Sequence, residues 1–312
     1  MNPLSTIYGA VVRTKNSLYD RGVLKSRRLS APVISVGNLS VGGSGKTPFV
    51  ILLGKLLEHR GIRFDVLSRG YGRKTRGVLA VDPNGSPGDF GDEPLLIAKR
   101  LGCPVIVGEN RYEAGLFAEK EFGPQLHILD DGFQHRSLAR DFDIVLITPE
   151  DGQDQLLPGG RLREPISTLR RADAVVFASD RQPHEFALPQ PVWRIKRGVD
   201  ISGAPDRPVV FCGIAKPHKF LEQLHAVGVQ PAAEKFYRDH YAYTASDICE
   251  LRNLHDQNHA DGFITTEKDA INLGPRLSEL GNVMIARVVM ELTPADALDT
   301  ILRVIAERRP QA

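Results

Sequence analysis

The sequence predicts an α/β fold, in which helices cover both faces of a mostly parallel sheet and a smaller C-terminal α/β domain follows. Short apolar runs of strand length alternate with helix-like segments between residues 33 and 177, a pattern typical of parallel sheets. A second alternating series starts near residue 209, and Ala187–Pro208, rich in proline and turn residues, separates the two. We therefore predict three parts, at residues 1–30, 31–195 and 196–312.

The composition is that of an ordinary folded protein. Of the 312 residues, 42% are hydrophobic and 25% are charged, which is close to the average for globular proteins. Cys103, Cys212 and Cys249 are far apart, so we expect neither a disulfide framework nor a zinc site. The apolar runs are too short to cross a bilayer, and the N-terminus lacks the pattern of a signal peptide. A cytoplasmic location follows as the expectation.

Residues 1–30 carry a local excess of positive charge. They contain six Lys or Arg residues against one acid, Asp20, whereas the whole chain has a net charge of +2. Because the excess is local, we expect no general nucleic-acid surface. Apolar residues recur at helical spacing from Leu4 to Tyr19. Two interpretations stay open: the amphipathic helix packs on the domain, or it lies in the headgroup layer of an anionic membrane.

The first strand is expected directly after Pro32, and the first long helix at 47–59, which carries six apolar residues. Further helices are expected at 93–101 and 111–122. Strands are expected at 33–36, 64–67, 104–107, 126–129, 144–147 and 174–177, and in the second series at 209–212, 263–265 and 283–289.

A phosphate-binding loop is predicted between the first strand and the first long helix. Small residues there allow backbone N–H groups to surround phosphate oxygens, and the helix N-terminus adds the positive end of its dipole. Lys46 can reach the β- and γ-phosphates, and the Thr47 hydroxyl can ligate Mg²⁺. Ser40 stands where the usual motif has glycine, which requires ordinary backbone angles at that position. We predict a P-loop NTPase-like fold whose nucleotide-binding residues are Ser40, Val41, Gly42, Gly43, Ser44, Gly45, Lys46 and Thr47; the alternative is a glycine-rich turn with an incidental Lys-Thr pair.

Two carboxylates, Asp130 and Asp131, end the strand expected at 126–129. On its own such a pair is usually a solvated turn, but in a P-loop protein an acid at this place holds Mg²⁺ directly or through water. We therefore predict Thr47, Asp130 and Asp131 as the metal site. Gln134 and His135 follow at the same sheet edge, where parallel sheets bind ligands.

A GTP-driven switch is the weaker alternative. Guanine-binding GTPases carry Asn/Thr-Lys-x-Asp, and the nearest string here, Thr266-Glu267-Lys268-Asp269, has its lysine at a different position. Asp130-Asp131-Gly132 also lacks the Asp-x-x-Gly spacing of a switch loop.

Several strings occur in a fixed order between about residues 33 and 270. They are Ser35–Leu39, Gly42–Pro48, Leu67–Arg73, Gly91–Pro94, Leu129–His135, Pro158–Pro165, Asp239–Tyr241 and Thr266–Ala270. Together they closely resemble the tetraacyldisaccharide 4′-kinase (lipid A 4′-kinase) family. The turn Ile214–Pro217 departs from the Gly-Asn-Pro version typical of that family.

The resemblance implies an enzyme that transfers the γ-phosphate of ATP, with Mg²⁺, to the 4′-hydroxyl of tetraacyl diglucosamine 1-phosphate. It also implies a peripheral location on the cytoplasmic face of the inner membrane, with a lipid disaccharide substrate, an anionic membrane surface as partner and no obligate protein partner. A sugar hydroxyl is a poor nucleophile and benefits from a positioned base. The family's base maps to Asp92 and its supporting histidine to His240, which with Lys46 form the expected catalytic set. Without the resemblance, Asp92 would be assigned as the start of the following helix and His240 as a loop histidine.

Further positions that match the lining of the family's site are Arg69, Tyr71, Glu93, Gln134, His135, Arg163 and Glu164. The planar guanidinium of Arg163 suits phosphate oxygens. Two other classes of function remain as alternatives. One is a P-loop NTPase switch or metallochaperone-type protein, against which the missing guanine and metal motifs weigh. The other is a non-catalytic peripheral membrane protein, in which Asp92 would have no use.

Overall fold

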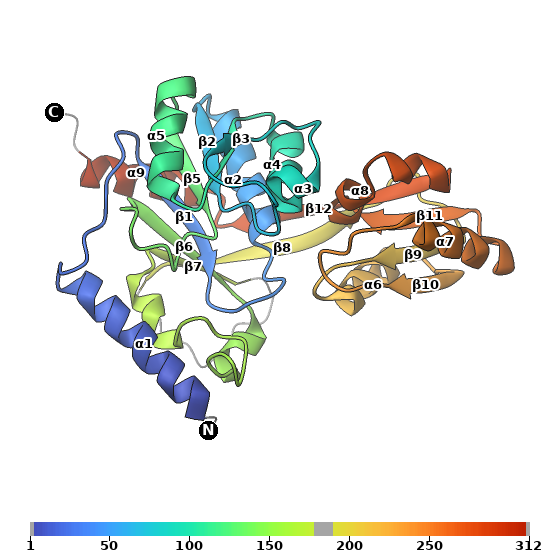
Figure 1. The fold of residues 1–312 in the computed structure, drawn as a ribbon, viewed down its shortest axis with the longest axis horizontal. Coiled ribbons are helices and arrows are strands. Elements are labelled where there is room, and N and C mark those ends of the chain that lie inside the picture. The colour runs from blue at the N-terminus through green and yellow to red at the C-terminus, as the bar shows by residue number, and fades with distance from the viewer. Residues whose placement is uncertain (1–2, 178–189, 310–312) are drawn as a thin grey trace.

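The computed structural model describes residues 3–177 and 190–309 of the chain (Figure 1). In these residues twelve strands form one sheet in the order β10-β9-β11-β12-β8-β7-β6-β1-β5-β2-β4-β3. All pairings are parallel except β3 with β4 and β8 with β12. The predicted α/β class with a mostly parallel sheet is therefore confirmed.

The first part of the sheet is formed by β1 (Val33–Asn38), β2 (Phe64–Ser68), β3 (Leu79–Ala80), β4 (Val105–Val107), β5 (Leu126–Asp130), β6 (Phe142–Ile147) and β7 (Ala174–Phe177). Its helices are α2 (Lys46–His59), α3 (Pro87–Phe90), α4 (Asp92–Leu101) and α5 (Arg111–Phe122), with 3-10 segments η1 (Pro149–Gln153) and η2 (Ile166–Arg171). The apolar residues of α2 and α4 pack on one face of the sheet, and those of α5 and η2 on the other. This is the predicted arrangement of helices on both faces.

The second part is smaller and also consists of parallel strands flanked by helices. It contains β9 (Pro208–Cys212), β10 (Ala233–Phe236) and β11 (Gly262–Thr266), with α6 (Pro217–Ala226), α7 (Ala245–Gln257), α8 (Glu267–Leu273) and η3 (Gly274–Leu280). Two separate apolar cores flank these strands, one under α6 and one under α7, α8 and η3.

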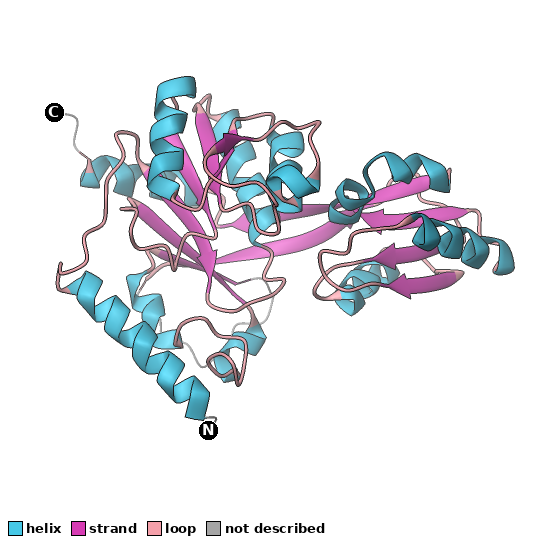
Figure 2. Ribbon diagram, in the orientation of Figure 1, coloured by secondary structure: helices cyan, strands magenta, loops and turns pink. Residues whose placement is uncertain are grey.

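Two long strands, β8 (Val192–Asp200) and β12 (Val283–Thr293), run between the two parts (Figure 2). β12 pairs with β11 through residues 283–286 and with β8 through residues 287–293. The interpretation of Ala187–Pro208 as a turn-rich separator was wrong for residues 192–200, since Trp193, Ile195 and Val199 alternate with polar residues and are buried. Residues 178–189 lie outside the described part of the chain.

The last helix, α9 (Ala297–Arg308), packs with the first part of the molecule. Ala297, Leu298, Ile301 and Ile305 belong to the apolar core that contains α2, and Arg308 forms an ion pair with Asp173. The predicted division at residue 195/196 therefore places α9 with the smaller domain although its contacts are with the larger one. The division itself remains a prediction.

The first helix, α1 (Pro3–Asp20), lies against the loop that carries residues 155–164 (Figure 1). Its contacts are polar: the Ser5 hydroxyl donates to the carbonyl of Leu156, the Tyr8 hydroxyl to that of Arg163, and the Asn16 amide to Glu164. Leu4, Ile7 and Val11 on this helix are each more than 60% exposed. The apolar stripe found in the sequence is therefore divided: Leu4, Ile7 and Val11 are exposed, whereas Tyr8 of the same stripe contacts the core. No helix in the described ranges is long and apolar enough to cross a membrane.

Candidate active site

The P-loop follows β1 and leads directly into α2, as the sequence predicts. Gly42 and Gly45 have φ angles of 90° and 86°, in a region that side chains with a Cβ rarely occupy, so glycine is required there. Ser40 is not among the described non-glycine residues with positive φ. Its backbone instead bridges to Leu162, so a serine is accommodated at this position.

Asn38, the last residue of β1, forms hydrogen bonds with several residues of the P-loop. Its side-chain amide donates to the Ser40 carbonyl and the Ser44 hydroxyl, and its Oδ1 accepts from Lys46 Nζ at 3.0 Å and from Arg163. Asn38 is fully buried. This residue was absent from the predicted site, although its position at the carboxyl end of the strand before the loop was a usable signal.

Asp130 and Asp131 lie at the carboxyl end of β5, the strand next to β1. Asp131 accepts two hydrogen bonds from Arg163, at 2.7 and 2.8 Å, and lies 3.4 Å from Lys46 Nζ. Burial raises the pKa of Asp131, but Arg163 and Lys46 outweigh it and hold the pKa far below its usual range. The structure thus brings Lys46, Asp131 and Arg163 together beside the P-loop.

Asp130 is buried and has a different environment. Its Oδ2 accepts from the Ser68 hydroxyl at 3.1 Å, while its Oδ1 has no hydrogen-bond partner among the described residues. Burial and the nearby charges of Glu93 and Asp131 raise its pKa to about 7. A buried carboxylate oxygen without a partner is costly unless a cation or a proton neutralises it.

These surroundings fit a Mg²⁺ ion. Magnesium in kinases is held by one or two carboxylates together with substrate phosphates and waters, so a complete protein cage is not required. In the described ranges no cluster of three or more His, Cys, Asp or Glu side chains is arranged as a metal site. The free Oδ1 of Asp130 beside the P-loop is consistent with such a partly protein-bound ion.

A second cluster forms where α4 meets the smaller part of the chain. Asp92 is the first residue of α4 and is 5% exposed. Nδ1 of His240 lies 2.9 Å and 3.1 Å from its two carboxylate oxygens, and the Asn272 amide donates to one of them. His240 has a φ of 56°, an unusual conformation for a residue other than glycine and frequent at functional sites.

The charge balance of this cluster keeps Asp92 ionised. Burial raises the pKa of Asp92, but the hydrogen bond from His240 and the positive charge of Lys268 outweigh it, so the pKa is lowered. The hydrogen bond to Asp92 is also the largest cause of the raised pKa of His240. The predicted pair of Asp92 and His240, which are 148 residues apart in the chain, is thus in direct contact.

Of the remaining predicted residues, Tyr71, Glu93 and Gln134 contact residues of the two clusters, whereas Arg69 and His135 do not. Tyr71 lies with its ring 5.3 Å from that of His240, Glu93 lies 3.7 Å from Lys268, and Gln134 donates to the carbonyl of Asn38. Arg69 is exposed. His135 contacts Ser137, and burial together with the charges of Arg111 and Arg140 lowers its pKa to about 4.

The partners of Glu164 lie in α1 and η2 rather than in the P-loop. Its carboxylate accepts from Arg171 and from Asn16 of α1, so it connects α1 to the core. Five residues that were not among the predicted site residues also lie at the site, three of them within strings quoted for the resemblance: Ser68, Asp239 and Lys268, together with Arg111 and Asn272. Arg111 is buried at the start of α5, and burial lowers its pKa to about 10.

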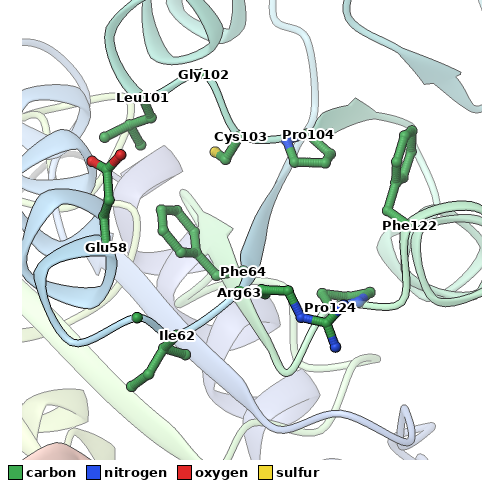
Figure 3. Close-up of a pocket in the computed structure, with 11 residues that line it drawn as sticks. Glu58, Ile62, Arg63, Phe64, Leu101, Gly102, Cys103, Pro104, Phe122 and Pro124 are labelled. Atoms are coloured by element: carbon green, nitrogen blue, oxygen red, sulfur yellow. The ribbon is translucent and has the colours of Figure 1, made fainter.

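A recess at the opposite edge of the sheet contains none of these residues (Figure 3). It is lined by the segments that precede β2, β4 and β5, including Arg63, Cys103 and Phe122. Burial raises the pKa of the Cys103 thiol to about 12, so the thiol is protonated and unreactive at neutral pH. The carboxyl edge, with the P-loop, is therefore the candidate site.

Comparison with known proteins identifies the family. The model of the family described as "Tetraacyldisaccharide-1-P 4'-kinase" matches residues 1–306. A protein of Koribacter versatilis named tetraacyldisaccharide 4′-kinase is 49% identical, covering 99% of this chain and all of that protein. A protein of the same name from Aquifex aeolicus is 40% identical over 87% of this chain and 88% of its own length.

A solved structure is similar over nearly the whole length. It is the "apo" form of LpxK from Aquifex aeolicus in complex with ATP, with a TM-score of 0.81 and 36% identity, and the match covers 97% of each chain. Sequence and structure therefore agree, and this chain belongs to the tetraacyldisaccharide-1-P 4′-kinase family.

Proposed function

We propose that this chain transfers the γ-phosphate of ATP to the 4′-hydroxyl of a tetraacylated diglucosamine 1-phosphate. Membership of the family supports the reaction and its substrate class, and the complex of the related Aquifex protein with ATP supports the donor. The observation that carries the proposal is the contact of Asp92 with His240, because it supplies an ionised carboxylate for a hydroxyl acceptor in a protein that also has a P-loop.

The P-loop and the cations beside it would hold the phosphates. Backbone N–H groups from Gly42 to Thr47 would surround the β-phosphate at the start of α2. Lys46 and Arg163, which pair with Asp131 in this structure, would contact the transferring group. When bound, Mg²⁺ would neutralise phosphate charge, with Asp130 and Thr47 as its protein ligands, while Asp131 stays paired with Arg163 and Lys46.

Asp92 would act as the base. As the 4′-hydroxyl oxygen attacks the γ-phosphorus, the bond from that phosphorus to the bridging oxygen breaks and ADP leaves. The hydroxyl proton passes to the Asp92 carboxylate, which is ionised at neutral pH. His240, whose Nδ1 lies 2.9 Å and 3.1 Å from the two Asp92 oxygens, would donate to Asp92 and orient it toward the acceptor. The Tyr71 ring next to His240 would contact the sugar.

The first helix would hold the protein at the membrane. Ile7 and Val11 are more than 60% exposed, while the polar side of α1 is bonded to the core. An apolar stripe of this kind is suited to the headgroup layer of an anionic bilayer, together with exposed basic residues such as Arg21 and Lys25. This arrangement supports a peripheral position on a membrane surface, and we propose that this surface is the cytoplasmic face of the inner membrane, where the enzyme would reach a lipid substrate.

The proposal is tested with γ-labelled ATP. The purified chain is incubated with Mg²⁺ and detergent-dispersed tetraacyl diglucosamine 1-phosphate, and the products are separated by chromatography. The expected result is label in a bisphosphorylated lipid, with little release of inorganic phosphate. Label that appears only as inorganic phosphate, whether or not lipid is present, would instead favour an NTPase of the switch or metallochaperone type.

A further inference from the structure

Lys268 occupies the centre of the cluster around Asp92, yet no role has been given to it. It is the second residue of α8, in the string Thr266–Asp269, and its side chain is only 16% exposed. Its Nζ lies 3.0 Å from Asp239 Oδ1, 3.2 Å from His240 Nε2, and 3.7 Å from both Asp92 Oδ2 and Glu93 Oε1. One ammonium group therefore contacts every charged member of the cluster.

The hydrogen-bonding roles of the His240 ring follow from its two neighbours. Nδ1 faces the ionised Asp92 carboxylate, which can only accept, so Nδ1 carries a proton. Nε2 faces the Lys268 ammonium, which can only donate, so Nε2 offers its lone pair. A proton on Nε2 would point at a positive charge. The geometry thus specifies the neutral imidazole with its proton on Nδ1.

We propose that Lys268 is a positioning residue for the phosphoryl transfer: by donating to Nε2 it holds His240 neutral with the proton on Nδ1, so that His240 directs Asp92 as the base. This inference rests on the proposed function, in which Asp92 takes the hydroxyl proton. The proposal also assigns a role to Lys268, whose position in the string Thr266–Asp269 differs from that of the lysine in a guanine-binding motif.

The other groups that face His240 would favour a second proton on the ring. Asp92 approaches from α4, and Asp239 precedes His240 in the loop with an oxygen 3.9 Å from Nε2. The Tyr71 ring lies 5.3 Å from the His240 ring, and Glu93 contacts Lys268 rather than the ring. Against these carboxylates Lys268 is the cation in contact with the ring in the described structure. The pKa of His240 is raised, chiefly by Asp92, and Lys268 opposes that rise. Removal of the ammonium would leave the carboxylates unopposed.

The position of Lys268 is fixed by the residue that follows it. Asp269 is buried, and its backbone N–H donates to the hydroxyl of Thr266, the N-cap of α8. Its carboxylate accepts from the Thr266 hydroxyl, the Gly213 backbone N–H and the Tyr243 hydroxyl. These contacts tie α8 to the loop that carries His240. Arg100 of α4 also pairs with Glu267 of α8, which links these two helices without contact to the His240 ring. A rigid support of this kind is what a positioning contact needs.

The test measures the titration of His240 in the full-length protein. Histidine ring nitrogens are labelled with ¹⁵N, and the His240 signals are assigned by their loss in His240→Gln. In the wild type we expect the neutral ring to carry its proton on Nδ1. In Lys268→Met and Lys268→Gln we expect the titration midpoint to rise by about one pH unit, as the loss of a unit charge a few ångströms away implies. Lys268→Arg keeps the charge and should stay near the wild type.

Arg100→Met is the matched control. It removes a cation that links α4 and α8 but does not touch His240, so it should lower thermal stability and leave the His240 midpoint unchanged. A neutral wild-type ring protonated on Nε2, or the same midpoint in folded Lys268→Met and wild type, would overturn the proposal. If Lys268→Met does not fold, the comparison of Lys268→Gln with Lys268→Arg decides the same question.

A kinetic measurement connects the contact to the reaction. Lys268 also lowers the pKa of Asp92, so the acidic limb of the kcat/KM profile for the lipid should move to higher pH in Lys268→Met by about one unit. The same limb in Arg100→Met should not move, and an unmoved limb in Lys268→Met would contradict the proposal. The NMR titration needs no substrate, so if the chain proves inactive toward the lipid disaccharide, the proposed function fails while the assignment of Lys268 to His240 is still decided.

Discussion

Asp130 and Asp131 are neighbours in the chain, but the structure gives their carboxylates opposite surroundings. Asp131 is bonded to Arg163 and lies beside Lys46, and its pKa is strongly lowered. Asp130 keeps a buried oxygen without a partner among the described residues, and its pKa is raised to about 7. One carboxylate is already satisfied by the protein, and the other is available for a cation. The two are therefore expected to respond differently to the same substitution.

Asp130→Asn should separate stability from activity. It removes a buried charge that is repelled by Glu93 and Asp131, so without Mg²⁺ the melting temperature should equal or exceed that of the wild type. The Mg²⁺ concentration needed for turnover should rise by more than the roughly 10–100-fold typical of residues outside the ligand set. Asp131→Asn, by contrast, leaves Arg163 and Lys46 poorly paired and should lower the melting temperature. Equal effects of the two variants on stability would contradict this division.

Lys46→Ala should reduce kcat by at least about 100-fold, because the transferring phosphoryl group loses a cation in direct contact. The structure holds Lys46 at this place through Asn38 and Asp131. Lys55, on the exposed side of the same helix, provides the control, and Lys55→Ala should retain near-normal turnover. Normal activity in a folded Lys46→Ala protein would remove the P-loop from the mechanism.

Much of the fold could be predicted from the sequence because its strands are buried on both faces and read as apolar runs. β1, β5, β6 and β9 are recognisable in this way. β8 was missed because prolines around it obscured the alternation of Trp193, Ile195 and Val199 with charged residues. The helix α9 itself was not predicted, and the division at 195/196 placed its residues with the smaller domain, whereas its apolar residues join the core that contains α2. Hydrophobic periodicity can indicate a helix or a strand, but contacts with residues distant in sequence decide the core against which it packs.

The candidate site was predictable in part. The P-loop and the Asp130–Asp131 pair are short sequence motifs whose residue types suit phosphate and Mg²⁺ binding, so they could be predicted directly. Asp92 and His240 were predicted only from the resemblance to a family. Arg111 and Lys268 were missed because each acts on groups that the fold brings from elsewhere in the chain. Asn38 was missed although its partner Lys46 is close in sequence and its place before the P-loop was a usable signal. Glu164 was expected among the substrate residues, but here its carboxylate binds Arg171 and Asn16. The functional roles of all these residues remain predictions.

His135 predicts a pH dependence of stability. Burial, with the charges of Arg111 and Arg140, lowers its pKa from 6.5 to about 4, so the unfolded chain takes up the proton first as pH falls. The contribution is complete above about pH 6.5 and is lost as pH falls toward 4. Melting curves from pH 7.5 to 4.5 should therefore show a smaller loss for His135→Gln than for the wild type, by an amount on the order of 1 kcal/mol. His59→Gln, on the surface, should follow the wild type; parallel curves for His135→Gln would contradict the prediction.

The two sides of α1 should have separable functions. Ile7→Asp with Val11→Asp places charge on the exposed stripe and should greatly weaken flotation with anionic vesicles, without a change in melting temperature. Charge reversal at Arg21 and Lys25 should weaken it further, most at low ionic strength, since each basic residue near such a surface contributes about 1 kcal/mol. Arg28 is unsuitable for this test, because it pairs with Asp141 of the core.

Asn16→Ala is the complementary variant of α1. Asn16 bonds to Glu164 and Arg171 on the packed side, so its loss should lower thermal stability and leave vesicle binding largely intact. Unaltered flotation of the Ile7→Asp, Val11→Asp protein would show that α1 serves only to pack on the core. In detergent-dispersed substrate all of these variants should keep their turnover, since none of the residues is placed at the phosphates.

The central claim is that Asp92, held by His240 across the junction of the two parts of the chain, activates a sugar hydroxyl for attack on ATP. The most direct test is transfer of γ-labelled phosphate to tetraacyl diglucosamine 1-phosphate, with the product position assigned by tandem mass spectrometry, for wild type and Asp92→Asn. Loss of a general base costs about 10²–10⁴-fold. We expect a 4′-phosphorylated product from the wild type and a reduction of that size in kcat for Asp92→Asn, with ATP binding preserved. Wild-type turnover by a folded Asp92→Asn protein, or a product phosphorylated at another hydroxyl, would contradict the account.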